Sequence, residues 1–110
     1  MRLQIKKRKL KAEHCEGLSA AIGFMFNFFP KNAKILALGK EQSVSLHMLF
    51  VFFPLLAIFL NSKMRVVDIK KLKPFTFYTS PKKAKYVVEI PLSLVSGLRL
   101  SIGDKIKFIS

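Results

Sequence analysis

Residues 45–61 constrain the fold more than any other part of the chain, because apolar surface is most concentrated there. They read SLHMLFVFFPLLAIFLN, and no formal charge occurs between Gln42 and Ser62. Three structures are compatible with such a stretch: a membrane-spanning helix, a buried helix, or two buried strands that meet at Pro54. Whichever of these forms, the rest of the chain has to be arranged around it.

The strand interpretation meets the fewest objections. As a helix rising ~1.5 Å per residue, the continuous apolar run 46–60 would cover roughly 22 Å. That length falls short of the ~30 Å hydrocarbon core of a bilayer, and Pro54 in mid-helix would remove a hydrogen bond and clash with the preceding turn. Aromatic and β-branched residues instead suit strands that are buried on both faces. We therefore expect two strands here, with Pro54 at an edge, a bulge or a change of direction. A small membrane-associated protein remains an alternative.

The rest of the chain is typical of many short strands with one or two short helices. A basic first strand is expected over residues 2–11, with Leu3 and Ile5 on one face, and a short helix over residues 16–25. The remaining expected elements are strands at 33–38, 64–69, 86–90 and 105–109, a polar turn at 39–43, a hairpin at 57–69, an exposed segment at 75–80 and a helical turn at 91–95. In the strands, Tyr86, Val88 and Ile90 should face one way, and Ile106 and Phe108 should face inward. This pattern predicts one compact, β-rich α+β domain over residues 1–110, whose antiparallel or mixed sheet forms a sandwich or a partial barrel.

The formal net charge of +14 is the most unusual property of the composition. Six of the 20 basic side chains lie within residues 1–11, which contain no acid, so the rest of the chain is also basic. Such a field attracts polyanions, which include nucleic acid, anionic lipid and acidic proteins. A lysine-rich surface that only keeps a heat-adapted protein solvated is the alternative.

Residues 70–86 (KKLKPFTFYTSPKKAKY) are the strongest candidate binding segment. Basic residues alternate there with aromatic ones, a combination that can follow a phosphate backbone while rings stack on bases. Because only four basic residues of the chain are arginine, which is the usual reader of guanine edges, such binding should tolerate any sequence. In the opposing interpretation the rings are core and the lysines line a solvated loop. The candidate polyanion-binding residues are Lys70, Lys71, Lys73, Lys82, Lys83, Lys85, Tyr78 and Tyr86.

Nothing in the sequence predicts an enzyme, a cofactor or a metal site. His14 and Cys15 lie between two glutamates, but adjacent residues point in different directions and no second Cys or His lies at ligand spacing. Asp68 and Glu89 are the one carboxylate pair expected to meet across strands. His47 is expected to be a satisfied core residue. Phosphate-binding glycine loops, nucleophile elbows and dinucleotide fingerprints are missing from the sequence.

The cysteine count and the N-terminal residues bear on the compartment. A single cysteine cannot form an internal disulfide. The basic N-terminal residues lack the apolar run of a signal peptide. We therefore expect a cytoplasmic protein. A nucleic acid or an acidic protein is the expected kind of partner, and a membrane is not.

Several blocks of the sequence, in order, resemble a known family. They are GFMF at 23–26, His47-Met48 with Pro54 and AIFLN at 57–61, VVDI at 66–69 with LKPF at 72–75, and YVVEIP at 86–91 with Gly103-Asp104. Together they resemble the family named domain of unknown function 192 over about residues 1–110. The resemblance implies a small β-rich domain found in prokaryotes, including archaea, and it supplies no established activity.

The chain departs from the family pattern at four positions. The family usually has Trp where His47 stands, Lys and Asn where Leu49 and Phe50 stand, and Asp where Leu56 stands. We expect that a site formed by those polar residues elsewhere in the family is filled here by apolar side chains. Residues 88–109 also resemble the hairpin of AbrB-like DNA-binding regulators, but without the usual arginine early in the helix, so the longer resemblance is preferred.

Overall fold

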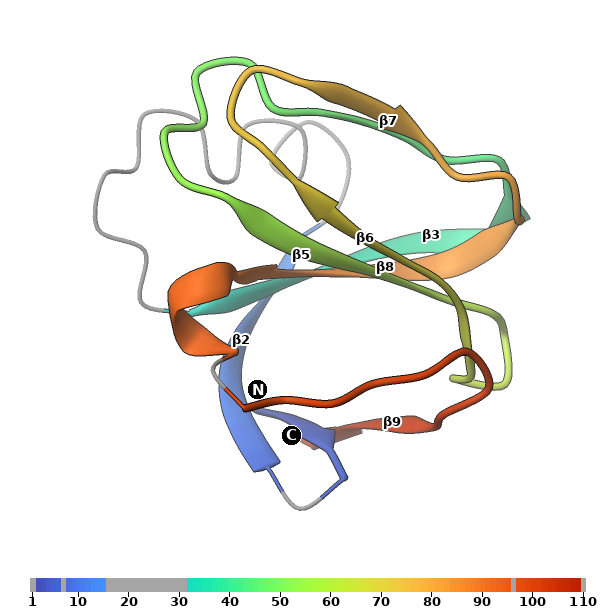
Figure 1. Ribbon diagram of the computed structural model, residues 1–110. Coiled ribbons are helices and arrows are strands. Elements are labelled where there is room, and N and C mark those ends of the chain that lie inside the picture. Colours follow the sequence, from blue (N-terminus) through green and yellow to red (C-terminus); the bar gives the residue numbers. More distant parts are fainter. Residues whose placement is uncertain (1, 7, 16–31, 96, 110) are drawn as a thin grey trace.

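The structure is a computed structural model that describes residues 2–6, 8–15, 32–95 and 97–109. Apart from one short 3-10 turn, the regular structure of these residues is all strand (Figure 1). The elements are β1 (Arg2–Ile5), β2 (Arg8–Cys15), β3 (Ala33–Gln42), β4 (Ser45–His47), β5 (Leu55–Leu60), β6 (Val66–Leu72), β7 (Phe77–Thr79), β8 (Ala84–Pro91), η1 (Leu92–Leu94) and β9 (Ile106–Ile109).

Seven of the strands form one mixed sheet in the order β6-β5-β8-β3-β2-β1-β9. Its pairs are antiparallel except β2–β3, which are parallel. The other two strands, β4 and β7, pair only with each other in the described structure, as a small antiparallel sheet. In Figure 1 this small sheet lies above β3, β5 and β8, while β9 lies below them. The protein is thus β-rich, with the small sheet as a separate layer.

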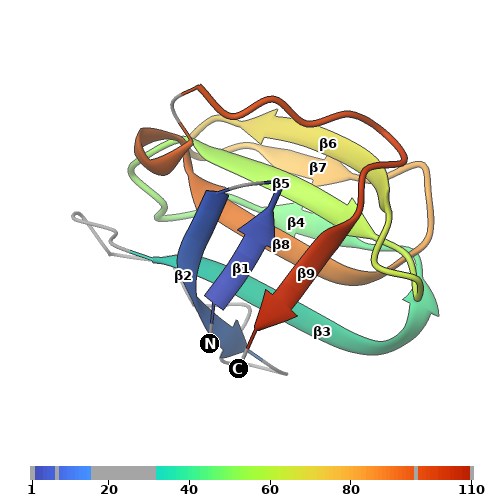
Figure 2. The same cartoon turned by 90° about the horizontal axis from the view of Figure 1, so that it is seen from below.

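The large sheet curls until its two edge strands meet. The Val66 amide donates to the Asp104 carbonyl, and the Gly103 amide donates to the Val66 carbonyl, both at 2.8 Å. The Ile106 amide also donates to the carbonyl of Met64 at 3.0 Å. These bonds join the beginning of β6 to the turn that leads into β9. The sheet therefore forms a partly closed barrel, and the view from below shows β1, β2 and β9 crossing in front of the other strands (Figure 2).

The central strand β5 separates two hydrophobic cores. All six of its residues are buried, and side chains along a strand alternate between faces. One face, with Ile58, contributes to an inner core inside the curl. The other face, with Phe59, contributes to an outer core between the large sheet and the β4–β7 layer. Major members of the inner core are Leu3, Ile5, Ile35, Ile90 and Ile106, and major members of the outer core are Val44, Met48, Leu55, Leu72 and Val87.

Several sequence-based expectations are confirmed. The second half of the apolar stretch is a strand, β5, and the tight turn after it leads into β6. Tyr86, Val88 and Ile90 all contribute to the inner core, as do Ile106 and Phe108. Pro91 precedes a single 3-10 turn, η1. Within the described residues, no helix is long and apolar enough to cross a membrane.

The first half of the apolar stretch differs from the expectation of a buried strand. Pairing stops at His47, and the chain then forms a loop in which Phe50 has φ 56. The chain must leave the small sheet here and return to the large one for β5, and Pro54 lies at that return. Its carbonyl accepts from the Leu92 amide at 3.1 Å. Residues 45–47 form the strand β4, and the expectation that the first strand reaches Pro54 is therefore wrong for residues 48–53.

Three other expectations need correction or lie outside the described residues. The basic segment 2–11 is two antiparallel strands, β1 and the first half of β2, which a turn at Lys6 connects. Residues 39–42 continue β3, because Gly39 at φ 82 allows a bulge instead of a turn. The helix expected over residues 16–25 lies outside the described residues. The described residues contain η1 alone as helix, which does not confirm the α+β assignment.

Replacing the buried Phe59 by alanine should destabilise the protein by about 3–5 kcal/mol, because a ring with no exposed surface leaves a cavity in the outer core. Urea denaturation of the wild-type and variant proteins measures the free energy of unfolding. Phe77→Ala is the matched control, since that ring is exposed and its loss should change the free energy by less than about 0.5 kcal/mol. Equal losses in both variants would contradict the placement of Phe59 at the centre of the outer core.

Candidate binding surface

The outward face of the β4–β7 sheet presents an exposed ring pair, His47 and Phe77. These residues are direct cross-strand partners. The Met48 amide donates to the Thr76 carbonyl at 2.8 Å and the Ser80 amide donates to the Val44 carbonyl at 3.0 Å, so the backbone bonds flank the pair on either side. His47 and Phe77 therefore occupy a non-hydrogen-bonded position, where cross-strand side chains come closest.

The alternation of the two strands explains why these side chains face outward. Leu46 and Tyr78, the neighbouring pair, are half-buried and pack against the outer core. Ser45 and Thr79, the next pair along, are exposed on the same face as the rings, and their hydroxyl oxygens lie 2.8 Å apart. The outward face is thus polar at one end and aromatic at the other.

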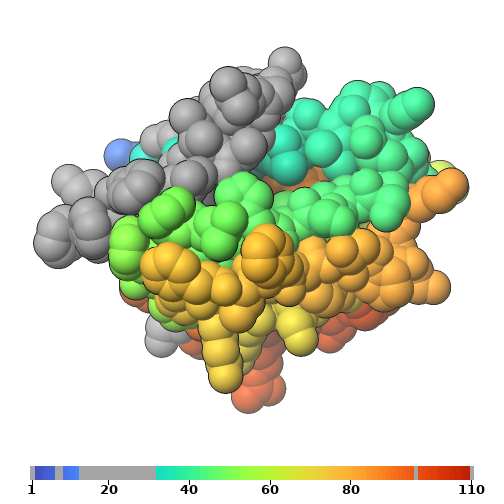
Figure 3. Space-filling model, turned by 90° about the horizontal axis from the view of Figure 1, so that it is seen from above, coloured from blue at the N-terminus to red at the C-terminus, as the bar shows by residue number. Residues whose placement is uncertain are grey.

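More aromatic side chains lie in the loops that adjoin one end of the β4–β7 sheet. The rings of Phe50 and Phe52 meet the ring of Phe75 edge-on, with centroid distances of 6.3 and 5.4 Å. The exposed fractions are 70% for Phe77, 50% for Phe75, 45% for Phe50, 42% for Phe52 and 40% for Leu49. We call these five residues, with His47, the aromatic surface. Figure 3 shows the green segment that contains β4 and its loop beside the gold segment that contains β7.

The two loops of the aromatic surface are held by main-chain bonds to one residue. Met48 is buried, its amide donates to Thr76, and its carbonyl accepts from the amide of Phe75 at 2.8 Å and from that of Val51 at 3.2 Å. Phe50 and Phe75 both have positive φ, at 56° and 61°. This conformation costs a residue other than glycine of order 1–3 kcal/mol, and such strain is found most often at functional sites.

A partly buried polar cluster attaches β7 to the large sheet. The Tyr78 hydroxyl donates to Oδ2 of Asp68 at 2.5 Å, and the hydroxyl of Ser80 donates to the same oxygen at 2.9 Å. The Tyr78 ring lies 5.8 Å from the ring of Phe59, and Lys70 Nζ lies 5.5 Å from its centroid. The bond to Asp68, with burial, raises the pKa of Tyr78 to about 12. We infer that this cluster holds β7 in a fixed position against β6.

The candidate lysines lie on β6 and on the segments before and after β7. Lys70 and Lys71 are exposed on β6, and Lys73 follows that strand beside Leu72, which pairs with Leu55. Lys82 and Lys83 precede β8, near the opposite end of β5. These five lysines form no ion pair with any residue that the structure describes. Lys73 and the Lys82–Lys83 pair therefore flank β7 along the chain. Lys70 lies over the Tyr78 ring, and Lys71 pairs with the inner-core residue Leu56.

Tyr78 and Tyr86, the two candidate tyrosines, are anchored in the protein. Tyr78 is half-buried in the cluster described above, and Tyr86 packs edge-on against Phe108 with centroids 5.4 Å apart. Lys85 Nζ lies 5.6 Å from the Tyr86 ring centroid. The structure thus brings Lys70 to Tyr78 and Lys85 to Tyr86. In residues 70–86, the aromatic rings most exposed to solvent are those of Phe75 and Phe77.

Leu49, Phe50 and Phe52 were not expected at the surface. Leu49 and Phe50 are exposed in the loop and fill no pocket of the described structure, whereas Leu56 is buried in the inner core. One signal for the exposure was present. The polar residues that the resemblance places at positions 49 and 50 elsewhere in the family indicate a solvated loop. His47, which was expected in the core, is exposed.

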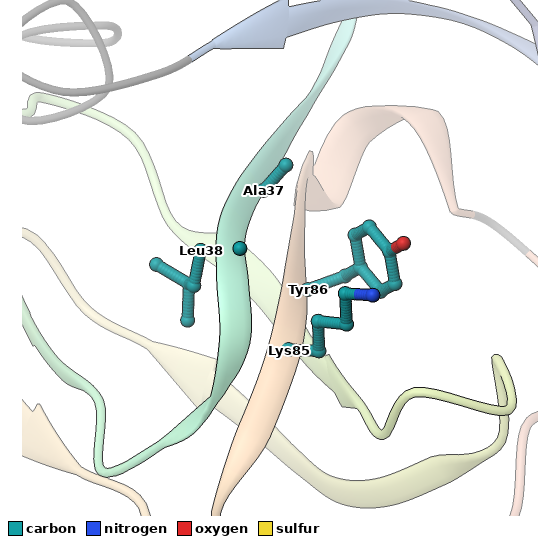
Figure 4. A pocket seen from close by; sticks show the side chains of 5 residues that line it. Ala37, Leu38, Lys85 and Tyr86 are labelled. Carbon is teal, nitrogen blue, oxygen red and sulfur yellow. The ribbon is translucent and has the colours of Figure 1, made fainter.

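A shallow pocket of about 410 Å³ lies where β3 bulges away from β8. It is lined by Ala37, Leu38, Gly39, Lys85 and Tyr86. Figure 4 shows Lys85 and Tyr86 side by side, with Leu38 pointing away from them. This lining supplies one ammonium group and one phenol and contains no carboxylate.

The other candidate chemical groups do not form a site among the described residues. Within the part of the chain that the structure describes, no three His, Cys, Asp or Glu side chains lie close enough to hold a metal. The strand β2 contains Glu13, His14 and Cys15, whose side chains are outside the description, as is Glu16. Asp68 and Glu89 do not meet, because β5 lies between their strands.

Glu89 has an unusual environment even though it lacks a carboxylate partner. It is half-buried on the outer-core face of β8, opposite Ala57 on one side and Lys34 on the other. Desolvation raises the pKa of Glu89 to about 7, against the opposing effect of the Lys34 charge. A carboxyl that is more basic in the folded protein than in the unfolded chain weakens the fold once it ionises.

The Tyr78–Asp68 bond predicts a stability change in alkali. Since the folded-state pKa of about 12 lies above the ordinary value of 10, the contribution is complete below pH 10 and is lost as the pH rises through 12. In a Tyr86→Phe background Tyr78 is the only phenol, so its ionisation can be followed by phenolate absorbance. Asp68→Asn should move that midpoint back toward 10, and an unchanged midpoint would contradict the bond.

Glu89 predicts a stability change near neutrality. Because its pKa is raised from 4.5 to about 7, its contribution is complete below pH 4.5 and is lost as the pH rises through 7. Urea denaturation should therefore show Glu89→Gln gaining stability relative to wild type between pH 4.5 and 8. Lys34→Met should steepen the wild-type loss, since the opposing charge is removed. A constant difference between Glu89→Gln and wild type across this range would contradict the prediction.

Comparison with known proteins identifies relatives over most of the chain. UPF0127 proteins of Pyrococcus horikoshii and Pyrococcus furiosus are 35% and 37% identical to it. The first match covers 84% of this chain and 82% of the relative, and the second covers 79% and 76%. A UPF0127 protein of Thermococcus sibiricus is 39% identical over 66% of this chain and 47% of its own length. These organisms are thermophilic archaea.

Two solved structures share the fold. One is a protein of unknown function from Novosphingobium aromaticivorans, with a TM-score of 0.85, 20% identity and coverage of 97% of this chain and 84% of that one. The other is a putative transcription regulator from Sinorhizobium meliloti, with a TM-score of 0.83, 23% identity and coverage of 96% and 89%. At these identities the likeness concerns the fold alone. The sequence profile of the family described as "Uncharacterized ACR, COG1430" matches residues 4–108, and the chain therefore belongs to this family, domain of unknown function 192.

Proposed function

We propose that this protein is a binding module, a single cytoplasmic domain over residues 1–110, that holds nucleic acid by its phosphates. The observation that carries the proposal is the aromatic surface, with exposed rings on β7 and its flanking loops and lysines beyond both ends of that strand. Rings and lysines in this arrangement supply the two interactions that proteins use to bind nucleic acid without reading its sequence.

The charge of the molecule supports a polyanionic ligand. The formal net charge is +14, and Lys70, Lys71, Lys73, Lys82 and Lys83 form no ion pair with a described residue. Lysines that neutralise phosphates release counterions, which makes binding favourable and dependent on salt. The basic residues of β1 and β2 lie on the opposite side of the molecule from β7, so they form a separate surface (Figure 1).

Heat adaptation explains the lysines but not the phenylalanines. The archaeal relatives come from hot habitats, where lysine-rich surfaces are common. A surface selected only to be well solvated would not expose phenylalanine rings, because an exposed ring forgoes the favourable free energy of burial. Yet the exposed fractions of Phe50, Phe52, Phe75 and Phe77 are 42–70%. Contiguous exposed apolar surface with a polar border is typical of an interaction site. The combination of exposed rings and lysines therefore favours a ligand.

Binding of labelled oligonucleotides across a salt series tests this function. Two triple variants, Lys70/Lys71/Lys73→Ala and Lys82/Lys83/Lys85→Ala, should each weaken binding of single strands. Each should also reduce the slope of log affinity against log salt by up to about 2, at ~0.7 per phosphate contact.

Lys9/Lys11/Lys107→Ala is the matched control for this test. It removes the same charge from exposed positions on β2 and β9. It should change the slope less than either triple variant does. Equal effects of all three variants would show binding by net charge alone. No binding by the wild type at low salt would contradict the proposed function, and the search would then move to acidic protein partners.

A further inference from the structure

The ring pair on the outward face of β4–β7 differs from the rest of the aromatic surface in its geometry. Phe77 lies on a strand and not on a loop, and its ring is 70% exposed beside the exposed ring of its cross-strand partner His47. The side chains on the opposite face, Leu46 and Tyr78, are held in the outer core. The pair, called the platform below, is thus an exposed ring pair on a backbone that is fixed from below.

We propose that His47 and Phe77 stack on unpaired bases, so that the ligand of this surface is single-stranded nucleic acid and not a duplex. This inference rests on the proposed function and adds the ligand's form to it. In a duplex the faces of the bases are covered by their neighbours, and a ring on a sheet can reach base faces only where a strand is unstacked. Stacking tolerates any base, because every base has a π-face.

The positions of the lysines match a single strand of nucleic acid that crosses the platform. Lys73 lies beyond one end of β7, and Lys82 and Lys83 lie beyond the other, with Phe77 between them along the chain and in the fold. A strand whose bases lie on the rings can place its phosphates toward the lysines at both ends. This charge complementarity identifies the occupant as an anionic chain with aromatic units.

The supports beneath the platform also suit stacking. Stacking requires a ring that keeps its orientation, and β7 is fixed by the two hydroxyl bonds to Asp68 and by the backbone bonds at Met48 and Ser80. Insertion into a lipid surface would instead depend on apolar bulk at the loop tips and would be indifferent to a planar π-face. This difference separates the two occupants experimentally.

The chain contains no tryptophan, so Phe77→Trp introduces a single fluorescent reporter at the platform. Stacking of a base on this indole should quench its fluorescence when a single-stranded oligonucleotide is added, and an equimolar duplex of the same sequence should quench it far less. Ile102→Trp is the control, because Ile102 is also exposed but lies away from β7, in the segment before β9. Its fluorescence should not change. Quenching of both reporters to the same extent would overturn the proposal.

Substitution of Phe77 provides the second measurement. Phe77→Ala should weaken single-strand binding about tenfold, within the range of ~1–3 kcal/mol per stacked base, and should change duplex binding by less than about twofold. Phe77→Leu retains apolar bulk without a π-face and should lose nearly as much single-strand affinity as Phe77→Ala. Thermal unfolding confirms that each variant remains folded.

The outcomes separate this inference from the proposed function. Salt-dependent binding by the wild type with an equal loss for single strands and duplex in Phe77→Ala would overturn the stacking role and leave the proposed function in place. Absence of salt-dependent binding to either nucleic acid would overturn both. Binding to phosphatidylglycerol vesicles that Phe77→Leu preserves, without oligonucleotide binding, would assign the surface to lipid and would also overturn both.

Discussion

The burial of β5 on both faces is the constraint on which the rest of the structure depends. A strand in which all six residues are buried needs apolar cover on each side, and a single curved sheet can provide only one. The curl of the large sheet covers the face of Ile58, and the bonds at Val66 hold that curl closed. The face of Phe59 needs a second layer, and β4 and β7 provide part of it.

The exposed rings follow from how thin that second layer is. Within the described residues, the β4–β7 sheet has only two strands. One of its faces packs on the outer core, and the other face is left in solvent. Once Leu46 and Tyr78 are directed into the outer core, alternation places His47 and Phe77 in solvent. An isolated pair of three-residue strands would be marginal, and the bonds from Tyr78 and Ser80 to Asp68 secure it to β6. The platform is therefore a by-product of covering the core, stabilised by the half-buried carboxylate of Asp68.

Sequence reasoning succeeded where side-chain pattern and burial agree. The alternation of Tyr86, Val88 and Ile90 identified a strand and its inner face, and Pro91 marked the turn that follows. It failed in residues 48–53, which are as apolar as β5 and yet form a loop that exposes Leu49, Phe50 and Phe52. Hydropathy reports only that a side chain favours burial. Whether burial occurs depends on cross-strand pairing, and the pairing of β4 with β7 ends at His47. The candidate lysines were identified from the sequence, but their division between two ends of β7 depends on the register of β5, β6 and β8, which no local pattern contains.

The position of β1 in the large sheet has a consequence for synthesis of the chain. This strand lies between β2 and β9, and Leu3 pairs with both Leu10 and Phe108. The pair with Leu10 is local in the sequence and can form early. The pair with Phe108 joins the first and last strands of the large sheet. Contacts of such long range make folding slow, because loop closure must precede the gain from pairing. During translation the outward edge of β1 has no partner until β9 leaves the ribosome. Lysine side chains beside an open sheet edge discourage pairing with other chains, and Lys6 and Lys9 lie in this hairpin.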